Sequence, residues 1–336
     1  MKKIAYDDWN EEIYKKSLAL FGVDINKTKE HGAFESFVFD GANGTENLII
    51  KATHNSSRKK EILLGQIEWM DYLHKNGVPV TKPKKSVNGN FIETIDAKDG
   101  EFYITGHIKA EGKPLKEAAL TESLTFQYGK ITGRIHKLTK NFEPNLPGSR
   151  LQHWHEDEQI TNLSAHLPDD EKELKSLHSR IREKLLKIDT NPRDYGFIHT
   201  DLHTGNLIFN NDQIFVIDFF DSMYYWFAYD IAVIFYYLRW LMKDIKECDQ
   251  RDFIKNFAVN FLKGYNSESK FEKSWIGTFN LFLRTRDLEL LTVLFTQKGT
   301  KEYDKFKEWI PKFRERVLNE DKEIIELDEI FSEIIQ

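Results

Sequence analysis

Five polar residues with a defined spacing form the strongest chemical signal in the sequence. His199, Asp201, His203 and Asn206 lie in the run H-T-D-L-H-T-G-N, and Asp218 follows twelve residues after Asn206 in I-D-F. An Asp and an Asn five residues apart in one loop can point into a single site. The Asp can accept a proton from an attacking hydroxyl, and the Asn can bind a hard cation through its amide oxygen. Asp218, at the end of the next short strand, would complete the cation site.

This set of side chains fits phosphoryl transfer. Magnesium takes oxygen ligands, keeps several waters, and is normally shared between one or two carboxylates and the phosphates of a substrate. Asn206 and Asp218 therefore suffice as protein ligands. Asp201 is left as the general base, or as the group that orients the nucleophile, while positioning and charge neutralisation supply most of the catalysis.

The loop resembles that of the aminoglycoside phosphotransferase and choline kinase superfamily, which typically reads H-G-D-L-H-x-G-N. Seven of the eight positions agree, and Thr200 replaces the usual Gly. The resemblance implies that Asp201 is the catalytic base, that Asn206 and Asp218 bind magnesium, and that the two His residues support the loop. It also implies ATP or GTP as the phosphoryl donor. The implied fold is α+β and bilobal, like a protein kinase, with a small antiparallel β lobe containing one helix and a larger, mainly helical lobe.

The first third of the chain has the pattern of a small sheet with a helix. FESFVFDG and NLIIKATH are β-rich runs separated by a Gly- and Asn-containing turn, which predicts a hairpin. A helix with one apolar face follows and ends near Lys75. NGNFIETI and EFYITGHI predict a second pair of strands. We therefore expect residues 1–109 to form the nucleotide-binding lobe.

A lysine in this lobe is the main candidate for phosphate binding. Lys51 lies in the second predicted strand, on the face opposite Leu48 and Ile50, and could reach phosphates. In the superfamily, the strand lysine contacts the nucleotide's phosphates and is held by a Glu on the next helix. Glu68 is the best candidate for that partner, and Glu61 on the same helix is the alternative.

Two further segments of this lobe match the superfamily's nucleotide site. HGAFESFVF resembles the stretch that covers the nucleotide, so Gly32 and Ser36 could bring backbone N–H groups toward phosphate. The adenine should meet backbone groups of Gly106, His107 and Ile108, at the end of the strand that leads into EGKPL.

Residues 110–336 are expected to form the catalytic and acceptor-binding lobe. Residues 120–138 have a helical pattern, and the chain from Asp230 onward alternates helices with short polar loops. FNLFLRTRDLELLTVLF is the segment whose pattern suggests the most amphipathic helix. Asp230 lies in DSMYYWFAYDIA, which resembles the superfamily's segment after the metal ligand without its Gly, and is expected to anchor the loop rather than touch substrate.

The acceptor is not defined by these motifs, because superfamily members phosphorylate aminoglycosides, choline, homoserine, sugars or protein Ser and Thr. Arg284 and Arg286 could hold an anion, although pairing with Asp287 and Glu289 is favoured. An aromatic and acidic cavity in the C-terminal helices would suit a cationic amine. We therefore expect transfer to a hydroxyl of a small molecule, with an aminoglycoside, an amino sugar or an amino alcohol as candidates.

Composition sets limits on partners and location. The net charge of -6 argues against a nucleic-acid partner, which would require a basic face. Cys248 is the only cysteine, so no internal disulfide can form and a cytoplasmic location is expected. The N-terminal segment is not typical of a signal peptide, and the apolar run 226–242 is interrupted by charges and shorter than the roughly 20 residues that span a bilayer. A monomer or a homodimer is expected.

Three alternatives stay open from the sequence. The first is a protein Ser/Thr kinase of the same superfamily, and the second is a pseudokinase-like binding protein without turnover. Intact Asp201, Asn206, Asp218 and Lys51 argue against the second. The third is a metal hydrolase built on the His residues of the chain, and their spacing lacks the i, i+4 helical pair expected of a zinc site. Its ligands would be His153, His155, His199 and His203.

Overall fold

The chain folds into two compact units. The computed structural model describes residues 3–33, 35–117, 120–211, 213–296, 298–299, 301–320 and 325–335. One unit comprises Met1–Glu111 and Phe142–Leu151, and the other comprises Gly112–Asn141 and Gln152–Gln336. The segment Phe142–Leu151, which the sequence boundary at 109/110 assigns to the second lobe, therefore lies in the first unit.

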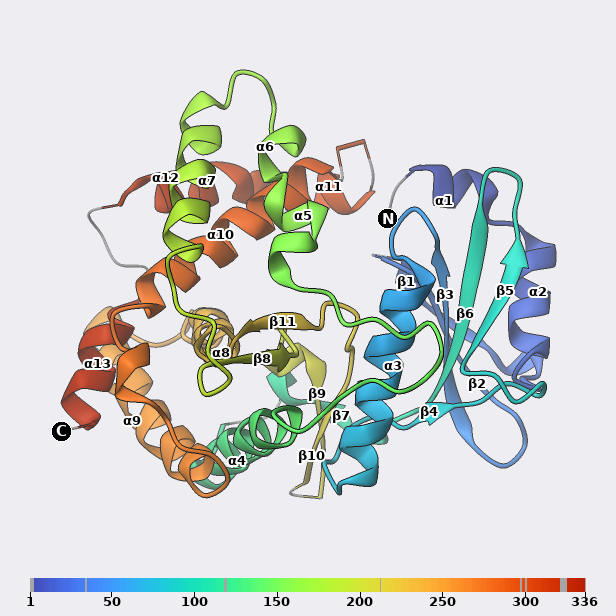
Figure 1. Cartoon of the computed structure of the whole chain (residues 1–336), viewed down its shortest axis with the longest axis horizontal. Helices are drawn as coiled ribbons and strands as arrows, with labels where there is room; N and C mark the ends of the chain where they lie inside the picture. The colour runs from blue at the N-terminus through green and yellow to red at the C-terminus, as the bar shows by residue number, and fades with distance from the viewer. Residues whose placement is uncertain are drawn as a thin grey trace. The chain divides into compact units, whose positions relative to one another are not determined.

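The first unit is an antiparallel sheet with helices (Figure 1). Its strands run in the order β1-β2-β3-β6-β4, and β5 also pairs with β6. The elements are α1 (Lys3–Asp8), α2 (Glu11–Ala19), β1 (Lys29–Ala33), β2 (Phe37–Ala42), β3 (Asn47–His54), α3 (Lys60–Lys75), β4 (Pro83–Lys84), β5 (Ile92–Asp96) and β6 (Glu101–Ile108).

The predicted strands and the helix that ends at Lys75 are confirmed. β2 and β3 form the expected hairpin, in which Lys51 pairs with Val38. Along β3, Leu48 and Ile50 are buried while Lys51 is half-buried, so the lysine lies on the other face, as predicted. Strand β1 and the two N-terminal helices were not predicted, and they add to the single helix expected beside the sheet.

Helices cover both faces of this sheet. Ile13 and Leu18 of α2 join a core with side chains of β2, β3 and β6 such as Phe39. Leu63 of α3 joins a second core with Ile92 of β5 and Tyr103 of β6. Burial on both faces explains why β6 is buried at nearly every position rather than at alternate ones.

The second unit is mainly helical and contains two small sheets, in the orders β10-β9-β7 and β11-β8. Its elements are β7 (Lys113–Pro114), α4 (Glu122–Thr139), α5 (Glu158–Thr161), α6 (Leu163–His166), α7 (Lys172–Leu185), β8 (Tyr195–Ile198), β9 (Leu207–Asn210), β10 (Gln213–Val216), β11 (Met223–Trp226), α8 (Phe227–Leu241), α9 (Glu247–Asn266), α10 (Phe279–Thr296), α11 (Lys301–Phe306), α12 (Ile310–Leu318) and α13 (Leu327–Ile334). The predicted change to helices is confirmed.

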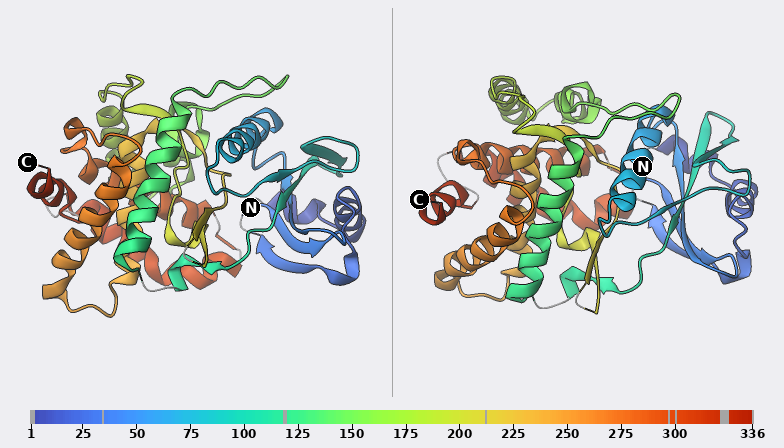
Figure 2. Two further views of the ribbon diagram at one scale, coloured as in Figure 1. Left: turned by 90° about the horizontal axis from the view of Figure 1, so that it is seen from below. Right: turned by 60° about the horizontal axis from the view of Figure 1, so that its bottom comes forward.

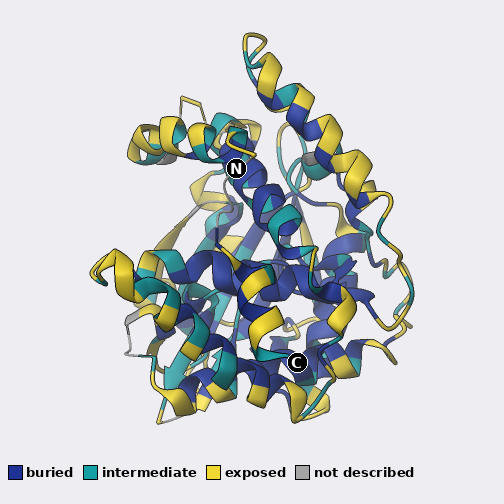
Figure 3. Ribbon diagram, turned by 90° about the vertical axis from the view of Figure 1, so that its left-hand side faces the viewer, coloured by how far each residue is buried: buried dark blue, intermediate teal, exposed yellow. Residues whose placement is uncertain are grey.

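Helix α8 is almost entirely buried in this unit. Its residues are buried continuously from Phe227 to Leu238, so the apolar run is a core helix. Figure 3 shows helices that are buried throughout beside others with one exposed side. No helix in the described part of the chain combines the length and the apolar character needed to cross a membrane.

Helix α10 differs from its prediction. The sequence pattern suggests an amphipathic helix, but Phe282 to Thr285 and Asp287 to Glu289 are buried. Four consecutive buried residues sweep more than one turn of 3.6 residues, so the helix is enclosed on all sides. The polar residues that seemed to form its solvent face therefore lie inside the protein and need partners there.

Helices α4 and α9 lie side by side (Figure 2). A Cβ atom added at Gly129 would lie 1.9 Å from the carbonyl oxygen of Phe261, and one added at Gly264 would lie 1.9 Å from that of Phe126. Glycine on each helix thus permits backbone-to-backbone contact. This close packing holds α4, whose Tyr128 donates to the carbonyl of Leu202 in the motif and whose His136 contacts Asp230.

Candidate active site

The motif loop lies between β8, which ends at Ile198, and β9, which begins at Leu207. Fully buried Asp230 of α8 fixes its start. The Asp230 carboxylate accepts hydrogen bonds from the backbone N–H of His199 (3.2 Å) and of Thr200 (2.7 Å). His136 of α4 donates a third (3.1 Å), and burial lowers the pKa of that imidazole, which favours its neutral form. The prediction that Asp230 anchors the loop is confirmed.

Thr200 occupies the position where related loops have glycine. Its φ of 64° lies in the left-handed region, which costs a β-branched residue about 1–3 kcal/mol. Its N–H bonds Asp230, and its hydroxyl donates to the carbonyl of Asp221 (2.7 Å). The loop therefore keeps the backbone conformation that glycine would adopt, with two hydrogen bonds that hold Thr200 in place.

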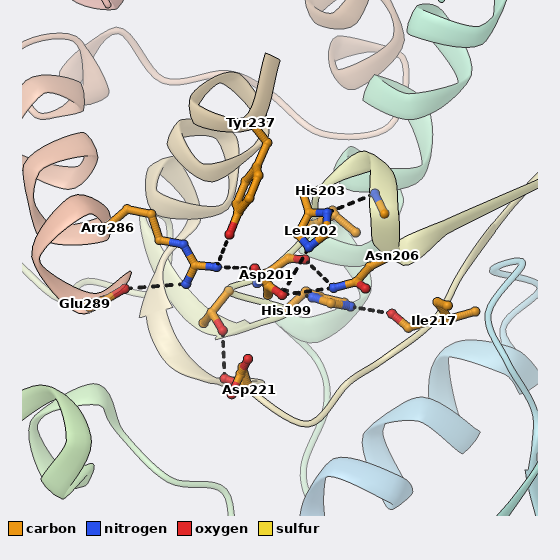
Figure 4. A network of polar contacts seen from close by, with 12 residues as sticks. His199, Asp201, Leu202, His203, Asn206, Ile217, Asp221, Tyr237, Arg286 and Glu289 are labelled. Carbon is orange, nitrogen blue, oxygen red and sulfur yellow. Dashed lines mark hydrogen bonds and ion pairs between the residues drawn. The ribbon is translucent and has the colours of Figure 1, made fainter. Parts of the chain in front are cut away.

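Asp201 is the centre of a network of polar contacts (Figure 4). Asn206 donates from its amide nitrogen to the Asp201 carboxylate (3.0 Å) and to its backbone carbonyl (2.9 Å). His203 Nε2 lies 3.4 Å from the same carboxylate, and Arg286 of α10 pairs with its other oxygen. Burial would raise the pKa of Asp201, but Arg286 and the His203 hydrogen bond outweigh it and hold the pKa below its usual value. Asp201 is therefore ionised at neutral pH.

The two loop histidines make hydrogen bonds within the loop and to the residue that follows β10. His199 is fully buried, its Nδ1 accepts from the Asp201 N–H (3.3 Å), and its Nε2 donates to the carbonyl of Ile217 (3.0 Å). His203 Nδ1 accepts from the Gly205 N–H (2.9 Å), and its ring stacks on Tyr237 at 4.3 Å between centroids. Both His199 nitrogens thus have protein partners, which leaves none for a metal.

Asn206 and Asp218 lie at the same end of the β9–β10 hairpin. Leu207 of β9 pairs with Val216 of β10. The pairing continues one step beyond the strands, because the N–H of Ile217 donates to the carbonyl of Asn206 (2.9 Å). The Asn206 amide nitrogen is directed at Asp201, and none of the described residues donates to its Oδ1. That Oδ1 and the Asp218 carboxylate are hard oxygen donors of the kind that magnesium takes. The residues present therefore fit such an ion.

The described residues contain no group of three His, Cys, Asp or Glu side chains that could hold a metal ion by themselves. His153, one of the four ligands considered for a metal hydrolase, instead contacts Tyr195 through its Nδ1 (3.0 Å) and stacks on Tyr224. Together with the occupied nitrogens of His199, these contacts give the hydrolase alternative no structural basis.

Arg286 joins the loop to α8 and α10. It is only 12% exposed, donates to the Tyr237 hydroxyl (2.8 Å), and lies 3.6 Å from the Glu289 carboxylate. Burial raises the pKa of Glu289 to about 7, against the opposing effects of Arg286 and of a hydrogen bond from Tyr229. Arg286 Nε and Glu289 Oε1 are both buried without a hydrogen-bond partner among the described residues. The cluster is therefore charged, enclosed and incompletely satisfied.

The expected pairing along α10 is partly wrong. Arg286 does pair with Glu289, but Arg284 donates to backbone carbonyls, including those of Val317 (3.3 Å) and Asn319 (2.9 Å). Asp287 pairs with Arg316 of α12. Adjacent residues on a helix point in different directions, so side chains of α10 reach partners on other elements.

The predicted phosphate-binding residues lie in the first unit. The carboxylate of Glu68 accepts from the backbone N–H of Asn145 (2.6 Å) and of Leu146 (3.1 Å), so it fixes the segment Phe142–Leu151. The pairing of Glu68 with Lys51 stays a prediction. Glu61 instead contributes its backbone carbonyl to the Arg150 N–H (3.0 Å).

Gly32 and Ser36 flank the tip of the β1–β2 hairpin. Gly32 has a φ of 114°, a conformation that glycine permits. The pairing of β1 with β2 is irregular between Glu30 and Gly32. The Ser36 side chain is buried and shares a hydrogen bond with the Thr53 hydroxyl (2.7 Å), so only its backbone could serve a phosphate. Their role in covering a nucleotide stays a prediction.

Gly106, His107 and Ile108 form the end of β6, between β3 and β4. Gly106 pairs with Ile50 on one side, and the Ile108 N–H donates to the Lys82 carbonyl (2.9 Å). A Cβ atom at Gly106 would also lie 2.4 Å from the Phe21 ring, which gives this glycine a packing role. Some of the backbone groups predicted to contact the adenine therefore already form hydrogen bonds within the sheet.

Comparisons with known proteins agree with the geometry. The sequence profile described as the phosphotransferase enzyme family matches residues 32–265, which is more than half of the chain. The chain belongs to this phosphotransferase family. It is 28% identical over 295 residues to the amicoumacin kinase of Bacillus subtilis (strain 168), covering 88% of this chain and 86% of that one.

Solved structures of two kinases are similar to this chain over nearly its whole length. An amicoumacin kinase in complex with AMP-PNP, Ca²⁺ and Ami has a TM-score of 0.88 and 28% identity, covering 97% of this chain and 98% of that one. A microcompartment-associated aminopropanol kinase has a TM-score of 0.69 at 17% identity, covering 97% and 99%. The first confirms the bilobal kinase-like fold, and the second is a likeness of fold alone.

Sequence reasoning named Arg286 as a possible anion-binding residue paired with Glu289, but it connected neither of them, nor Tyr237, with the motif loop. They lie far from the motif in sequence, on helices expected to contribute acceptor contacts or core packing. The signal available was the charged cluster R-T-R-D-L-E within an aromatic and aliphatic run, since charges in a buried helix must pair with something. Periodicity could not identify Asp201 as the partner.

Proposed function

We propose that this phosphotransferase moves the γ-phosphate of ATP to a hydroxyl of a small, cationic molecule. One observation supports this most directly. The Asp201 carboxylate is ionised and accepts from the amide nitrogen of Asn206, whose amide oxygen lies at the same end of a hairpin as Asp218. A base and two cation ligands in one loop are the parts that phosphoryl transfer requires.

The proposed cofactors are ATP or GTP and Mg²⁺. The related amicoumacin kinase binds AMP-PNP and Ca²⁺, and Mg²⁺ is preferred here because an amide oxygen and one carboxylate leave room for waters and phosphate oxygens. When bound, the ion would neutralise the charge that develops on the phosphates. Asn206 and Asp218 would hold it. Lys51 would bind phosphate, the hairpin tip with Gly32 and Ser36 would cover it, and backbone groups at the end of β6 would meet the base.

Asp201 would act on the acceptor hydroxyl. Its oxygens accept from Asn206 and His203 in a fixed orientation, so the carboxylate can hold the hydroxyl in line with the phosphate and take its proton as the new bond forms. His199 would maintain the loop by bridging Asp201 and Ile217. Arg286 would keep the carboxylate charged.

Excess negative charge around the loop favours a cationic acceptor. Asp201, Asp221 and Glu289 supply three carboxylates, and those of Asp201 and Glu289 contact Arg286. The raised pKa of Glu289, to about 7, shows that burial without enough positive charge penalises its ionised form. An ammonium group on the acceptor would provide that charge and could donate to Glu289 Oε1. We place the enzyme in the cytoplasm, as a monomer or homodimer.

A substrate screen tests the proposal. ATP consumption and a mass increase of one phosphate would be measured against hydroxyl-bearing amines, amino sugars, homoserine and generic protein substrates. We expect turnover with at least one small amine and none with its deaminated counterpart. Phosphate found only on protein would favour the protein kinase alternative, and nucleotide binding without any turnover would favour a pseudokinase.

Glu289→Gln tests the cationic acceptor. In the wild type, Glu289 loses its proton as pH rises through about 7, so the KM for an amine acceptor should fall by about tenfold between pH 6 and 8. Gln resembles the protonated form, so the variant should keep the high KM at every pH. Glu247→Gln, an exposed change on α9, is the matched control. A pH-dependent KM that survives in the Gln variant would contradict the assignment.

A further inference from the structure

A second feature of the helical unit is a pocket between α8 and α12, of about 250 Å³. Small-molecule sites commonly occupy about 300–1,000 Å³, so this volume suits one ring system rather than a whole ligand. The residues that define this α8–α12 pocket are Tyr236, Arg239, Trp240, Trp309, Lys312 and Arg316. None of them belongs to the sequence motif.

Its aromatic side chains are unusually open. Trp240 is 46% exposed and Trp309 is 42% exposed, and their rings meet at 6.0 Å with an angle of 69°. Trp309 also contacts Phe313 at 6.2 Å. Indole surface left in water is costly, and two such rings at an angle form two walls against which a flat group could stack.

The pocket also has an excess of positive charge. Arg316 is paired with Asp287, whereas Arg239 and Lys312 form no ion pair with any residue that the structure describes. The Arg239 guanidinium lies 5.3 Å from the Tyr236 ring, and that of Arg316 lies 5.8 Å from the same ring. Burial, and then the like charge of Arg316, lower the pKa of Arg239. One carboxylate among three cations leaves the pocket suited to an anion.

The pocket adjoins the candidate active site through Tyr237. On one side, Tyr237 stacks on His203 at 4.3 Å and accepts from Arg286. On the other side, its ring meets Trp240 at 4.6 Å, one helical turn further along α8. A molecule with its hydroxyl at Asp201 could therefore extend past Tyr237 into the pocket.

We propose that the α8–α12 pocket binds a flat ring system bearing an anionic oxygen, at the end of the acceptor remote from the reacting hydroxyl. This inference rests on the proposed phosphotransfer for the identity of the molecule, but the pocket's chemistry is independent of it. The ring would lie in the angle between Trp240 and Trp309, stacked on the face of one indole, while Arg239 and Lys312 would bind the oxygen. The acceptor would thus be positive near Asp201 and negative at its far end.

Three naphthalenes with different charge would test the pocket without turnover. 1-Naphthoate, 1-naphthalenemethanol and 1-naphthylmethylamine share one ring system, and their binding to the full chain can be compared by titration calorimetry in the absence of nucleotide. We expect the anion to bind at least about tenfold more tightly than the alcohol, and the amine to bind most weakly. Equal binding of all three would overturn the proposal.

Variants locate the binding. Trp309→Ala should weaken naphthoate binding by about tenfold or more, and Arg239→Gln combined with Lys312→Gln should remove the preference for the anion. Lys243→Gln and Lys307→Gln change exposed lysines outside the pocket and should have no effect. Because all the substituted side chains are partly exposed, the variants should fold, and unchanged melting temperatures would verify this. Undiminished binding in the pocket variants would overturn the assignment.

Competition separates this inference from the proposed function. If phosphotransfer is observed, naphthoate should compete with the acceptor and not with ATP. Inhibition that is non-competitive toward the acceptor would overturn the subsite. Failure of the proposed function would appear as absent turnover with naphthoate binding intact, whereas failure of the pocket would appear as normal turnover with no charge-selective naphthoate binding.

Discussion

Asp201→Asn should lower kcat by about a thousandfold, because the substituted amide cannot take a proton from the acceptor hydroxyl. The carboxylate now accepts from Asn206 and His203 and pairs with Arg286. An amide at this position would keep the size of the side chain while losing its charge. Binding of a non-hydrolysable nucleotide should therefore change little, because the candidate cation ligands Asn206 and Asp218 are intact. Steady-state kinetics and calorimetry would measure the two effects separately.

A matched control distinguishes loss of chemistry from loss of fold. Asp169 is fully exposed, and Asp169→Asn makes the same chemical change far from the loop motif. It should retain wild-type kcat. If Asp201→Asn kept more than about a tenth of the activity with an unchanged melting temperature, Asp201 would be a positioning group and the proton would leave by another route.

The sequence was sufficient for the loop because its chemistry is local. Asp201 and Asn206 are five residues apart, and a two-strand hairpin brings Asp218 alongside, so spacing and strand pattern determine their proximity. The sheet of the first unit was predictable for a similar reason. Its hairpin has alternating apolar positions and a Gly-containing turn, which indicate both the strands and their pairing.

The parts that sequence reasoning missed depend on contacts distant in the chain. Helix α2 is short and rich in charge, and it is stabilised by Asn10 at its N-cap and by burial of Ile13 and Leu18 on the sheet. Strand β1 contains Gly32 and lacks an apolar pattern, so only its pairing with β2 defines it. Propensity alone cannot identify such elements.

Helix α10 shows the same limit at the candidate site. Its charged residues suggested a solvent face, yet Arg284, Asp287 and Glu289 are buried and pair with other elements or with backbone carbonyls. A one-dimensional pattern cannot separate an exposed charged face from an internal polar network. The residue types give a hint, because two arginines and two acids in an otherwise largely apolar helix need polar partners if the helix is buried.

Arg286→Met should lower kcat by about a hundredfold and shift the acidic limb of the pH profile to higher pH. In the wild type, Arg286 opposes the effect of burial and keeps the pKa of Asp201 below its ordinary value, so acid inactivation through this group occurs only at low pH. Without the guanidinium, burial is opposed mainly by His203, and the pKa of Asp201 rises. The base is then protonated, and activity lost, at a pH where the wild type still works. The carboxylate also loses a contact that orients it.

Arg286→Lys provides the conservative comparison. A lysine keeps the positive charge but lacks the guanidinium group that contacts Asp201, Glu289 and the Tyr237 hydroxyl together. The pH profile should therefore return toward that of the wild type, while kcat recovers only in part. Arg182→Met, an exposed change on α7, should behave like the wild type. A pH profile in Arg286→Met that overlays the wild type, with kcat still reduced, would mean that Arg286 acts on the acceptor or phosphate rather than on the ionisation of Asp201.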